Sequence, residues 1–149
     1  MIVALATGNI FASTSGVSSF VEVRDVCHGM IAAWKNGRRG ERYILAGTTL
    51  SYGDVFALIA RELGTRPPSI ALPDAVVTAG GGLGDLVEML VGRELELNSA
   101  ITAYAVCRGY RFSSQKAMRE LGYALSPLDV AVRDAVAWLR EHGMLPVSR

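Results

Sequence analysis

Residues 18–47 read SSFVEVRDVCHGMIAAWKNGRRGERYILAG, and this stretch decides the fold class that the sequence predicts. Its first part, residues 18–23, is mostly apolar and predicts a strand. Residues 24–36 carry apolar side chains at helical spacing, and Asp25 is well placed to cap the first turn of a helix. Glycines then end the helix, and residues 42–46, RYILA, predict a second short strand. A strand, a helix and a strand in succession indicate an α/β chain.

Helices dominate the rest of the sequence. The predicted helices are residues 2–6, 51–63, 73–91, 98–108, 114–121 and 126–143, and a further short strand is predicted at 69–72. Ser51 and Ser126 each begin an S-x-x-D pattern, which is typical of a helix N-terminus. The length of 149 residues is that of one domain. We therefore expect one helix-rich α/β unit over residues 1–149, with few short strands.

Single side chains in these helices carry further expectations. Trp34 and Trp138 fall on apolar helix faces, and both are expected to anchor the core. Lys116 is expected to cap or pair locally on its own helix. The glycines within residues 80–84 match neither common phosphate-loop pattern, so we expect a helix that a neighbouring backbone approaches closely.

Composition argues against several classes of partner. The 15 basic and 14 acidic side chains leave a net charge of +1, which gives no electrostatic reason to expect nucleic acid or an anionic membrane. No apolar run approaches the roughly 20 residues of a membrane span, and the N-terminus lacks the basic region of a signal peptide. Cys27 and Cys107 form no metal-ligand pattern with His28 or His142. We expect a soluble, cytoplasmic protein with buried free thiols and no metal site.

Four short segments, in order, carry a family resemblance. They are FVEVRDV at 20–26, GRRGERYIL at 37–45 with Gly47, FSSQKA at 112–117 followed by ELGY at 120–123, and PL at 127–128 followed by AVAW at 135–138. With this order and spacing the chain resembles, from about residue 2 onward, the C-terminal part of an extended short-chain dehydrogenase/reductase. The resemblance is to the NAD-dependent epimerase/dehydratase superfamily, in its dihydroflavonol-4-reductase-like and hopanoid-associated sugar epimerase branch.

The resemblance implies that residues 1–149 are the C-terminal substrate-binding portion of such an enzyme and that the N-terminal Rossmann nucleotide-binding half is missing. In the family, a GxxGxxG turn holds the cofactor and a Tyr-x-x-x-Lys pair transfers a proton beside the hydride step, and both lie upstream of the matched part. The only lysines here are Lys35 and Lys116, and Tyr104 is followed four positions later by Arg108 instead of a lysine. We expect no catalytic and no cofactor-binding residue in this chain, with NAD or NADP bound only by the complete enzyme.

Four residues are candidates for binding a small-molecule substrate. The resemblance implies that Arg24 faces the substrate cleft and that Arg108 and Arg111 lie where nucleotide-sugar relatives hold a phosphate. Tyr104, together with Tyr110, is a candidate wall of an aromatic substrate pocket. The alternative for the arginines is an ordinary surface position, and for the tyrosines a half-buried position at the edge of a lobe.

Two departures from the family pattern bear on the substrate. Ser18 stands where nucleotide-sugar members carry an arginine on the substrate diphosphate, and Ser113 replaces an aspartate. Both argue against a nucleotide-diphosphate sugar, and the substrate stays open.

Two hypotheses for the function stay open as well. In the first, the chain binds substrate for an NAD(P)-dependent reductase, epimerase or dehydratase, is not catalytic alone, and needs the nucleotide-binding half as a partner. In the second, it is a non-catalytic binding or oligomerisation module, a degenerate remnant of such an enzyme. A fragment of this kind is expected to expose apolar surface and a free strand edge, through which it self-associates.

Overall fold

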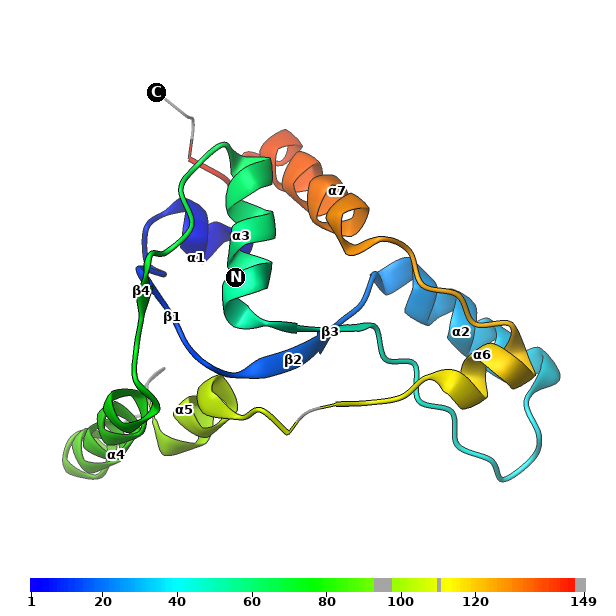
Figure 1. Cartoon of the computed structure of the whole chain (residues 1–149), viewed down its shortest axis with the longest axis horizontal. Coiled ribbons are helices and arrows are strands. Elements are labelled where there is room, and N and C mark those ends of the chain that lie inside the picture. The colour runs from blue at the N-terminus through cyan, green and yellow to red at the C-terminus, as the bar shows by residue number, and fades with distance from the viewer. Residues whose placement is uncertain (93–97, 110, 147–149) are drawn as a thin grey trace.

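The computed structural model describes residues 1–92, 98–109 and 111–146. Its elements in chain order are α1 (Ile2–Ala6), β1 (Ala12–Ser13), β2 (Val17–Phe20), α2 (Val23–Asn36), β3 (Thr48–Ser51), α3 (Tyr52–Leu63), β4 (Ile70–Ala71), α4 (Asp74–Val91), α5 (Ser99–Val106), α6 (Gln115–Leu121) and α7 (Leu128–Glu141). The helices far outweigh the short strands (Figure 1), so the predicted helix-rich α/β class is confirmed.

The strands pair in two small sheets. β2 and β3 run antiparallel with Val17 opposite Ser51, and β1 and β4 run parallel with Ala12 opposite Ile70. A two-stranded sheet is marginal by itself, so both depend on the helices packed around them.

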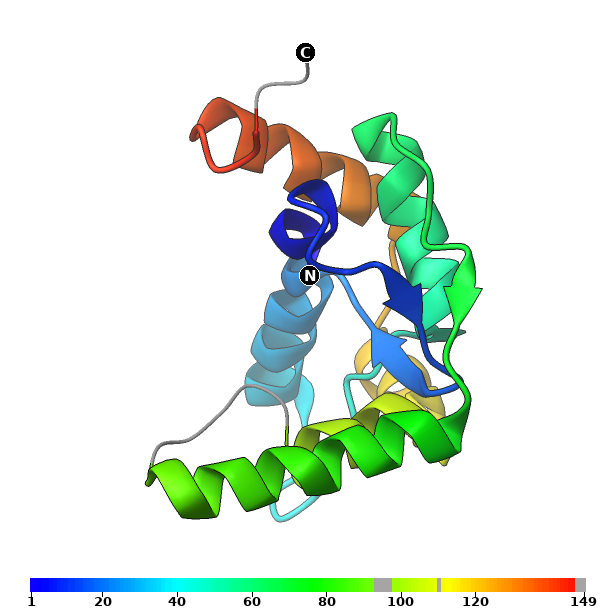
Figure 2. The same cartoon turned by 90° about the vertical axis from the view of Figure 1, so that its left-hand side faces the viewer.

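The helices of the described residues pack in three groups around the β2–β3 ribbon (Figure 1). The first group is α1, α3 and α7, and it holds the main core of Leu5, Val55, Ile59, Ala60, Val132 and Val136. The second group, α2 and α6, encloses a smaller cluster of Ala117, Leu121 and Tyr123. In the third group α5 packs on α4, and Figure 2 shows α4 along the edge of the molecule opposite α7.

The helix boundaries agree closely with those predicted from the sequence, but two of the three predicted N-caps are wrong. Ser51 caps α3 as predicted, because its Oγ accepts the N–H of Asp54 at 3.1 Å. Glu22, not Asp25, caps α2, since its carboxylate accepts the N–H of Arg24. Pro127 is the N-cap of α7 and no side chain caps that helix. The Asp25 carboxylate and Ser126 bond to each other instead, which local patterns could not reveal.

Residues 42–46 do not form a strand, and this prediction is wrong. The side chains still alternate as in a strand: Tyr43 and Leu45 pack against the α2–α6 cluster, while Ile44 is 51% exposed. In the part of the chain that the structure describes, the backbone N–H groups of residues 42–45 have no hydrogen-bond partner. A strand exists only with a paired neighbour, so alternation in the sequence is not sufficient.

The predicted tryptophan anchors are also wrong. Trp34 is 83% exposed and Trp138 is 52% exposed, with its ring stacked on His142 at a centroid distance of 4.0 Å. On α2 the buried positions are Asp25 and Gly29, so the helix packs through a face neighbouring the one that its large side chains occupy. The spacing of apolar residues identifies a helix but does not say which face is covered. Cys27, expected to be buried, is exposed for the same reason.

The glycine-rich helix is confirmed at one position. A Cβ on Gly81 would lie 2.0 Å from the Oγ1 of the buried Thr102 and 3.0 Å from the carbonyl oxygen of Asn98. Gly80 and Gly82 have no heavy atom within 4 Å of such a Cβ. The close approach of α5 to α4 therefore depends on Gly81 alone among these three glycines.

Candidate functional site

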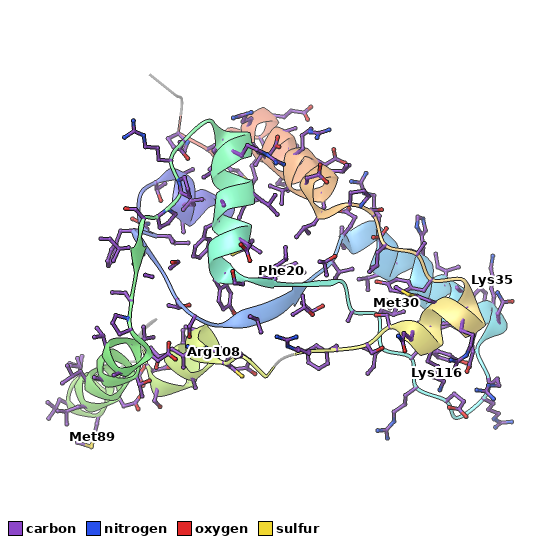
Figure 3. All side chains as sticks on the ribbon, in the orientation of Figure 1. Phe20, Met30, Lys35, Met89, Arg108 and Lys116 are labelled. Carbon is purple, nitrogen blue, oxygen red and sulfur yellow. The ribbon has the colours of Figure 1, made fainter. Side chains whose placement is uncertain are left out.

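The four candidate residues fall into separate parts of the molecule. Arg24 begins α2 and contacts α7, whereas Arg108 follows α5 and contacts the start of α4. Figure 3 places Arg108 beside α5, far from the α2–α6 group where Lys116 lies. Arg111 is exposed, and its backbone N–H donates to the carbonyl of Gly109 at 2.8 Å. Tyr110 lies outside the described residues, so its predicted place in an aromatic pocket stays a prediction.

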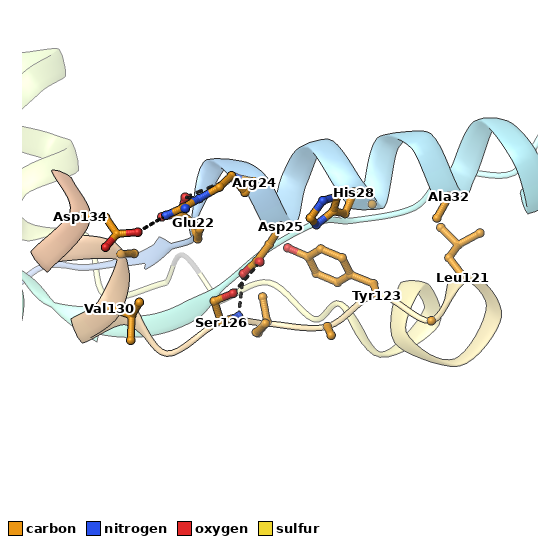
Figure 4. A pocket seen from close by; sticks show the side chains of 15 residues that line it. Glu22, Arg24, Asp25, His28, Ala32, Leu121, Tyr123, Ser126, Val130 and Asp134 are labelled. Carbon is orange, nitrogen blue, oxygen red and sulfur yellow. Dashed lines mark hydrogen bonds and ion pairs between the residues drawn. The ribbon is translucent and has the colours of Figure 1, made fainter. Parts of the chain in front are cut away.

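Arg24 lines a pocket of about 600 Å³ between α2 and the chain that leads from α6 into α7 (Figure 4). Its Nε donates to the Glu22 carboxylate at 2.7 Å, and its Nη2 donates to Asp134 of α7. These hydrogen bonds, first that to Asp134 and then that to Glu22, raise the pKa of the Arg24 guanidinium above its ordinary value. With both carboxylates bonded to its guanidinium, Arg24 joins α2 to α7. Its positive charge is therefore already compensated and is not available for an anionic ligand.

Asp25 is a buried residue of the same pocket and bonds its two sides together. Its two carboxylate oxygens accept the backbone N–H of Ser126 at 2.7 Å and the Ser126 hydroxyl at 2.8 Å. Tyr123 lies beside this carboxylate (Figure 4), and burial, followed by the negative charge of Asp25, raises the pKa of its phenol. The phenol therefore stays protonated at neutral pH. These hydrogen bonds connect α2 to the segment between α6 and α7, which indicates that the polar groups of the pocket stabilise the fold.

Tyr104 and Arg108 belong to a different environment, at the end of α5. Arg108 donates from Nη2 to Asp74 at 2.8 Å, and the other oxygen of that carboxylate accepts the Ser15 hydroxyl at 2.5 Å. The Arg108 and Asp74 side chains are 65% and 43% exposed, so the pair contributes little to stability. Tyr104 is 59% exposed and lines an apolar pocket of about 470 Å³ against β1 and α3.

A glycine that the sequence did not single out brings these residues together. Gly16 donates its N–H to the carbonyl of Ala105 at 3.0 Å, and Val17 donates to the carbonyl of Cys107 at 2.9 Å. A Cβ at Gly16 would lie only 2.4 Å from the Ala105 oxygen, so no larger residue fits. The chain entering β2 is thereby tied to the end of α5. No signal in a single sequence distinguishes this glycine from an ordinary loop glycine.

Lys116 pairs with a segment that is distant in the sequence and not with a residue of its own helix, so the expected local pairing is wrong. Its Nζ bonds the Glu41 carboxylate and the carbonyl of Arg42, and it lies 4.5 Å from the centre of the Tyr43 ring. This hydrogen bond, together with the charges of Lys116 and then Arg38, lowers the pKa of Glu41. The contacts hold residues 41–43 against α6.

Replacing Lys116 with methionine is expected to raise the pKa of Glu41 toward its ordinary value of 4.5. A carboxylate whose pKa is lowered by folding stabilises the protein above its unfolded pKa, and this stabilisation is lost as the pH falls through the lower folded value. The variant should therefore lose less stability than the native chain between neutral pH and the acid range below about 4.5. Carboxyl-carbon NMR titration and urea unfolding at several pH values measure both effects.

Lys35 supplies the control, since it is the other lysine of the chain and has no ion pair among the described residues. A Lys35→Met variant should leave the Glu41 titration unchanged. An unchanged Glu41 pKa in the Lys116→Met variant would contradict the assignment.

The described part of the chain contains neither a metal-binding cluster nor a membrane-spanning helix. No group of three or more His, Cys, Asp or Glu side chains there is arranged to hold a metal ion. None of its helices combines the length and the apolar character that crossing a membrane requires.

Known proteins show clear similarity to this chain. Over 97% of its length it is 31% identical to sterol demethylase protein B of Methylococcus capsulatus, of which it spans 44%. It is 26% identical over 90% of its length to human short-chain dehydrogenase/reductase family 42E member 1, of which it spans 36%. The chain thus spans less than half the length of these curated relatives. No protein-family model matches it.

Solved structures agree with the sequence relatives. The crystal structure of gox2253 superposes with a TM-score of 0.78 and 34% identity, over 98% of this chain and 44% of that one. The Bordetella bronchiseptica enzyme WbmF, crystallised with NAD+, superposes with a TM-score of 0.60 over 95% of this chain and 35% of its own. At 21% identity, the second likeness is one of fold alone.

Proposed function

This chain belongs to the short-chain dehydrogenase/reductase superfamily, in its NAD-dependent epimerase/dehydratase group, and from that membership we propose that it is the C-terminal, substrate-binding part of an NAD(P)-dependent reductase, epimerase or dehydratase. It acts with a nucleotide-binding half, supplied in the same or in another polypeptide, and is not catalytic by itself. The partial coverage of every reported relative supports this proposal, since the chain spans 35–44% of them.

The observation that carries the proposal is the segment 42–45. Its side chains alternate between a packed side and an exposed side, and its N–H groups have no partner among the described residues. These are the properties of a strand whose neighbour is not part of the described structure. We assign that neighbour to the sheet of the nucleotide-binding half.

Exposed apolar surface at this segment and on α2 supports a protein partner as well. Ile44 and Phe112 are each 51% exposed and line one shallow hollow of about 340 Å³. On α2, Met30 is 61% exposed and Trp34 is 83% exposed. Exposed large apolar side chains of this kind favour a protein partner that covers them.

The cofactor belongs to the partner in this proposal. WbmF carries NAD+ in its crystal structure, and the family relationship extends NAD or NADP to the complete enzyme. The chain itself has no Tyr-x-x-x-Lys pair and no GxxGxxG turn. Titration of the lone chain with NADH and NADPH is therefore expected to show no tight binding, and tight binding would contradict the proposal.

The test of the proposal is assembly with the partner half. The DNA immediately upstream is expected to encode GxxGxxG and Tyr-x-x-x-Lys in frame or in a shifted frame. The nucleotide-binding half that it encodes, produced as a separate polypeptide, should co-purify with this chain. Replacing Ile44 with proline removes one N–H of the free strand edge, so co-purification should fall at least tenfold while helical circular dichroism is retained. Ile44→Val keeps the N–H and should assemble normally. Absence of the upstream motifs, or equal assembly of the two variants, would reject the proposal.

A second candidate function, self-association, rests on α4. Its exposed large apolar side chains are Val76, Leu83, Leu86, Val87, Met89, Leu90 and Val91. Such a surface favours oligomerisation of a non-catalytic module. Light scattering distinguishes this candidate: dimers or larger species that a Leu90→Glu change dissociates would support it, and a monomer at high concentration would count against it.

A further inference from the structure

Ser114 does not cap the helix that it begins. It is the N-cap residue of α6, but its side chain makes no capping hydrogen bond, although a serine at this position usually accepts an N–H of the first turn. Its Oγ instead accepts the N–H of Ala46 at 2.9 Å and donates to the carbonyl of Ala46 at 2.7 Å. One buried hydroxyl thus bonds both backbone groups of Ala46, as a paired residue of an antiparallel sheet would.

Lys116 stands at the unfavourable end of the same helix. It lies in the first turn of α6, where the helix dipole disfavours a positive charge. Its Nζ donates to the carbonyl of Arg42 at 3.0 Å and to the Glu41 carboxylate, and it lies over the Tyr43 ring. The contacts of this lysine therefore serve the segment beside α6 and not the helix itself.

Together the two side chains hold the segment 42–46 at both of its ends. Arg42 is bonded through its carbonyl and Ala46 through its N–H and its carbonyl, and α6 lies alongside this part of the chain (Figure 1). Between these points Tyr43 and Leu45 pack against the α2–α6 cluster. The segment is thus kept in place without a neighbouring strand in the described part of the chain.

The spacing of the two residues suits this arrangement. Both belong to FSSQKA at 112–117, one of the segments that carry the family resemblance, and they are two positions apart. The first ends at the N-cap with a short side chain, and the second enters the first turn with a long one. One helix start can therefore reach two points of the adjacent chain that are four residues apart.

A backbone edge that is already fixed binds a new strand more tightly than a mobile one. Ordering the backbone of a single residue lowers an association constant about tenfold, and a surface that is ordered beforehand avoids this loss. We propose that Ser114 and Lys116 are positioning residues, which hold residues 42–46 ready to receive a strand of the nucleotide-binding half. The inference rests on the proposed function for the identity of the partner, whereas the positioning concerns this chain alone.

The first test measures the affinity of the chain for the separately produced nucleotide-binding half by titration calorimetry. Lys116→Met removes the hydrogen bonds and the charge but keeps a long unbranched side chain, and its Kd should rise at least tenfold. Ser114→Ala should weaken assembly to a similar extent, since it leaves both backbone groups of Ala46 without a partner. Lys116→Arg keeps donors for the same two oxygens and should bind within about threefold of the native chain.

Two controls separate positioning from net charge and from overall stability. Lys35→Met removes the same charge from a side chain that has no ion pair among the described residues, and its Kd should equal that of the native chain. Val136→Ala removes volume from the main core, in which Val136 is 1% exposed, so it should lower stability in urea without changing Kd.

The second test needs no partner. In the isolated chain, the NMR couplings between the amide and α protons of residues 43–45 should have the values of an extended backbone, and Lys116→Met should shift them toward averaged values. An unchanged Kd or unchanged couplings in Lys116→Met, or an equal loss of affinity in Lys35→Met or Val136→Ala, would overturn the proposal. Couplings that respond to Lys116→Met in a chain that never assembles with the half would keep the positioning role and reject only the proposed function.

Discussion

Replacing Gly47 with alanine is expected to destabilise the chain by about 3 kcal/mol, because the added Cβ meets backbone that cannot move aside. That Cβ would lie 1.9 Å from the carbonyl oxygen of Phe20 and 2.7 Å from the Cα of Val21. Gly47 also donates its N–H to the Ser19 hydroxyl at 2.9 Å, so a shift of this residue would break a second contact. Urea unfolding followed by circular dichroism measures the change in the free energy of unfolding.

Gly53→Ala is the matched control for Gly47. A Cβ there would meet its nearest heavy atom at 3.7 Å, an ordinary contact, and the residue lies inside α3. Alanine is the better helix former, so this variant should be stabilised by up to ~1 kcal/mol. Equal effects at the two positions would show that the approach of residue 47 to β2 is not tight.

Replacing Asp25 with alanine is expected to cost a similar amount, about 3 kcal/mol, because it removes a buried charged acceptor from two donors. Asp25 is 7% exposed, and both the N–H and the hydroxyl of Ser126 depend on its carboxylate. The loss should also loosen α7 from α2, which hydrogen exchange of the α7 amides would register. Unfolding in urea gives the magnitude.

The control for Asp25 is Asp134, whose carboxylate is 47% exposed and pairs with Arg24. Asp134→Ala should cost less than about 1 kcal/mol, as exposed ion pairs do. A double variant with Ser126→Ala should cost less than the sum of the single changes, since both remove one shared contact. Additive losses would contradict the assigned Asp25–Ser126 interaction.

The helices could be predicted from the sequence because their signals are local. Ser51 with its S-x-x-D pattern and Gly64 with its positive φ of 74° mark the ends of α3 in both the sequence and the structure. The four ordered segments likewise identified the family, since each is a short stretch of neighbouring residues. Caps, turns and apolar spacing depend on residues a few positions apart, which is the range that a sequence pattern covers.

The site could be predicted only in part, because it depends on contacts between distant segments. Tyr104 was predicted as a candidate wall of an aromatic pocket, but nothing local in the sequence relates it to Phe11 or Tyr52, which line the same pocket in the structure. Arg24 and Arg108 were both predicted as substrate-binding candidates, whereas the fold gives each its own carboxylate, Asp134 and Asp74. Whether an arginine forms an ion pair depends on which distant segment of the chain the fold brings next to it.

By itself, then, the sequence determined the class of the fold, most helix boundaries and the family. The tertiary structure decided which helix faces are covered, where Asp25 and Lys116 find their partners, and that residues 42–45 have strand-like alternation without a strand. The physical reason is that backbone preferences are set by near neighbours, whereas burial and hydrogen-bond satisfaction are set by whatever the fold brings within contact distance. Trp34 shows the difference most clearly, because its helix was predicted and its exposure was not.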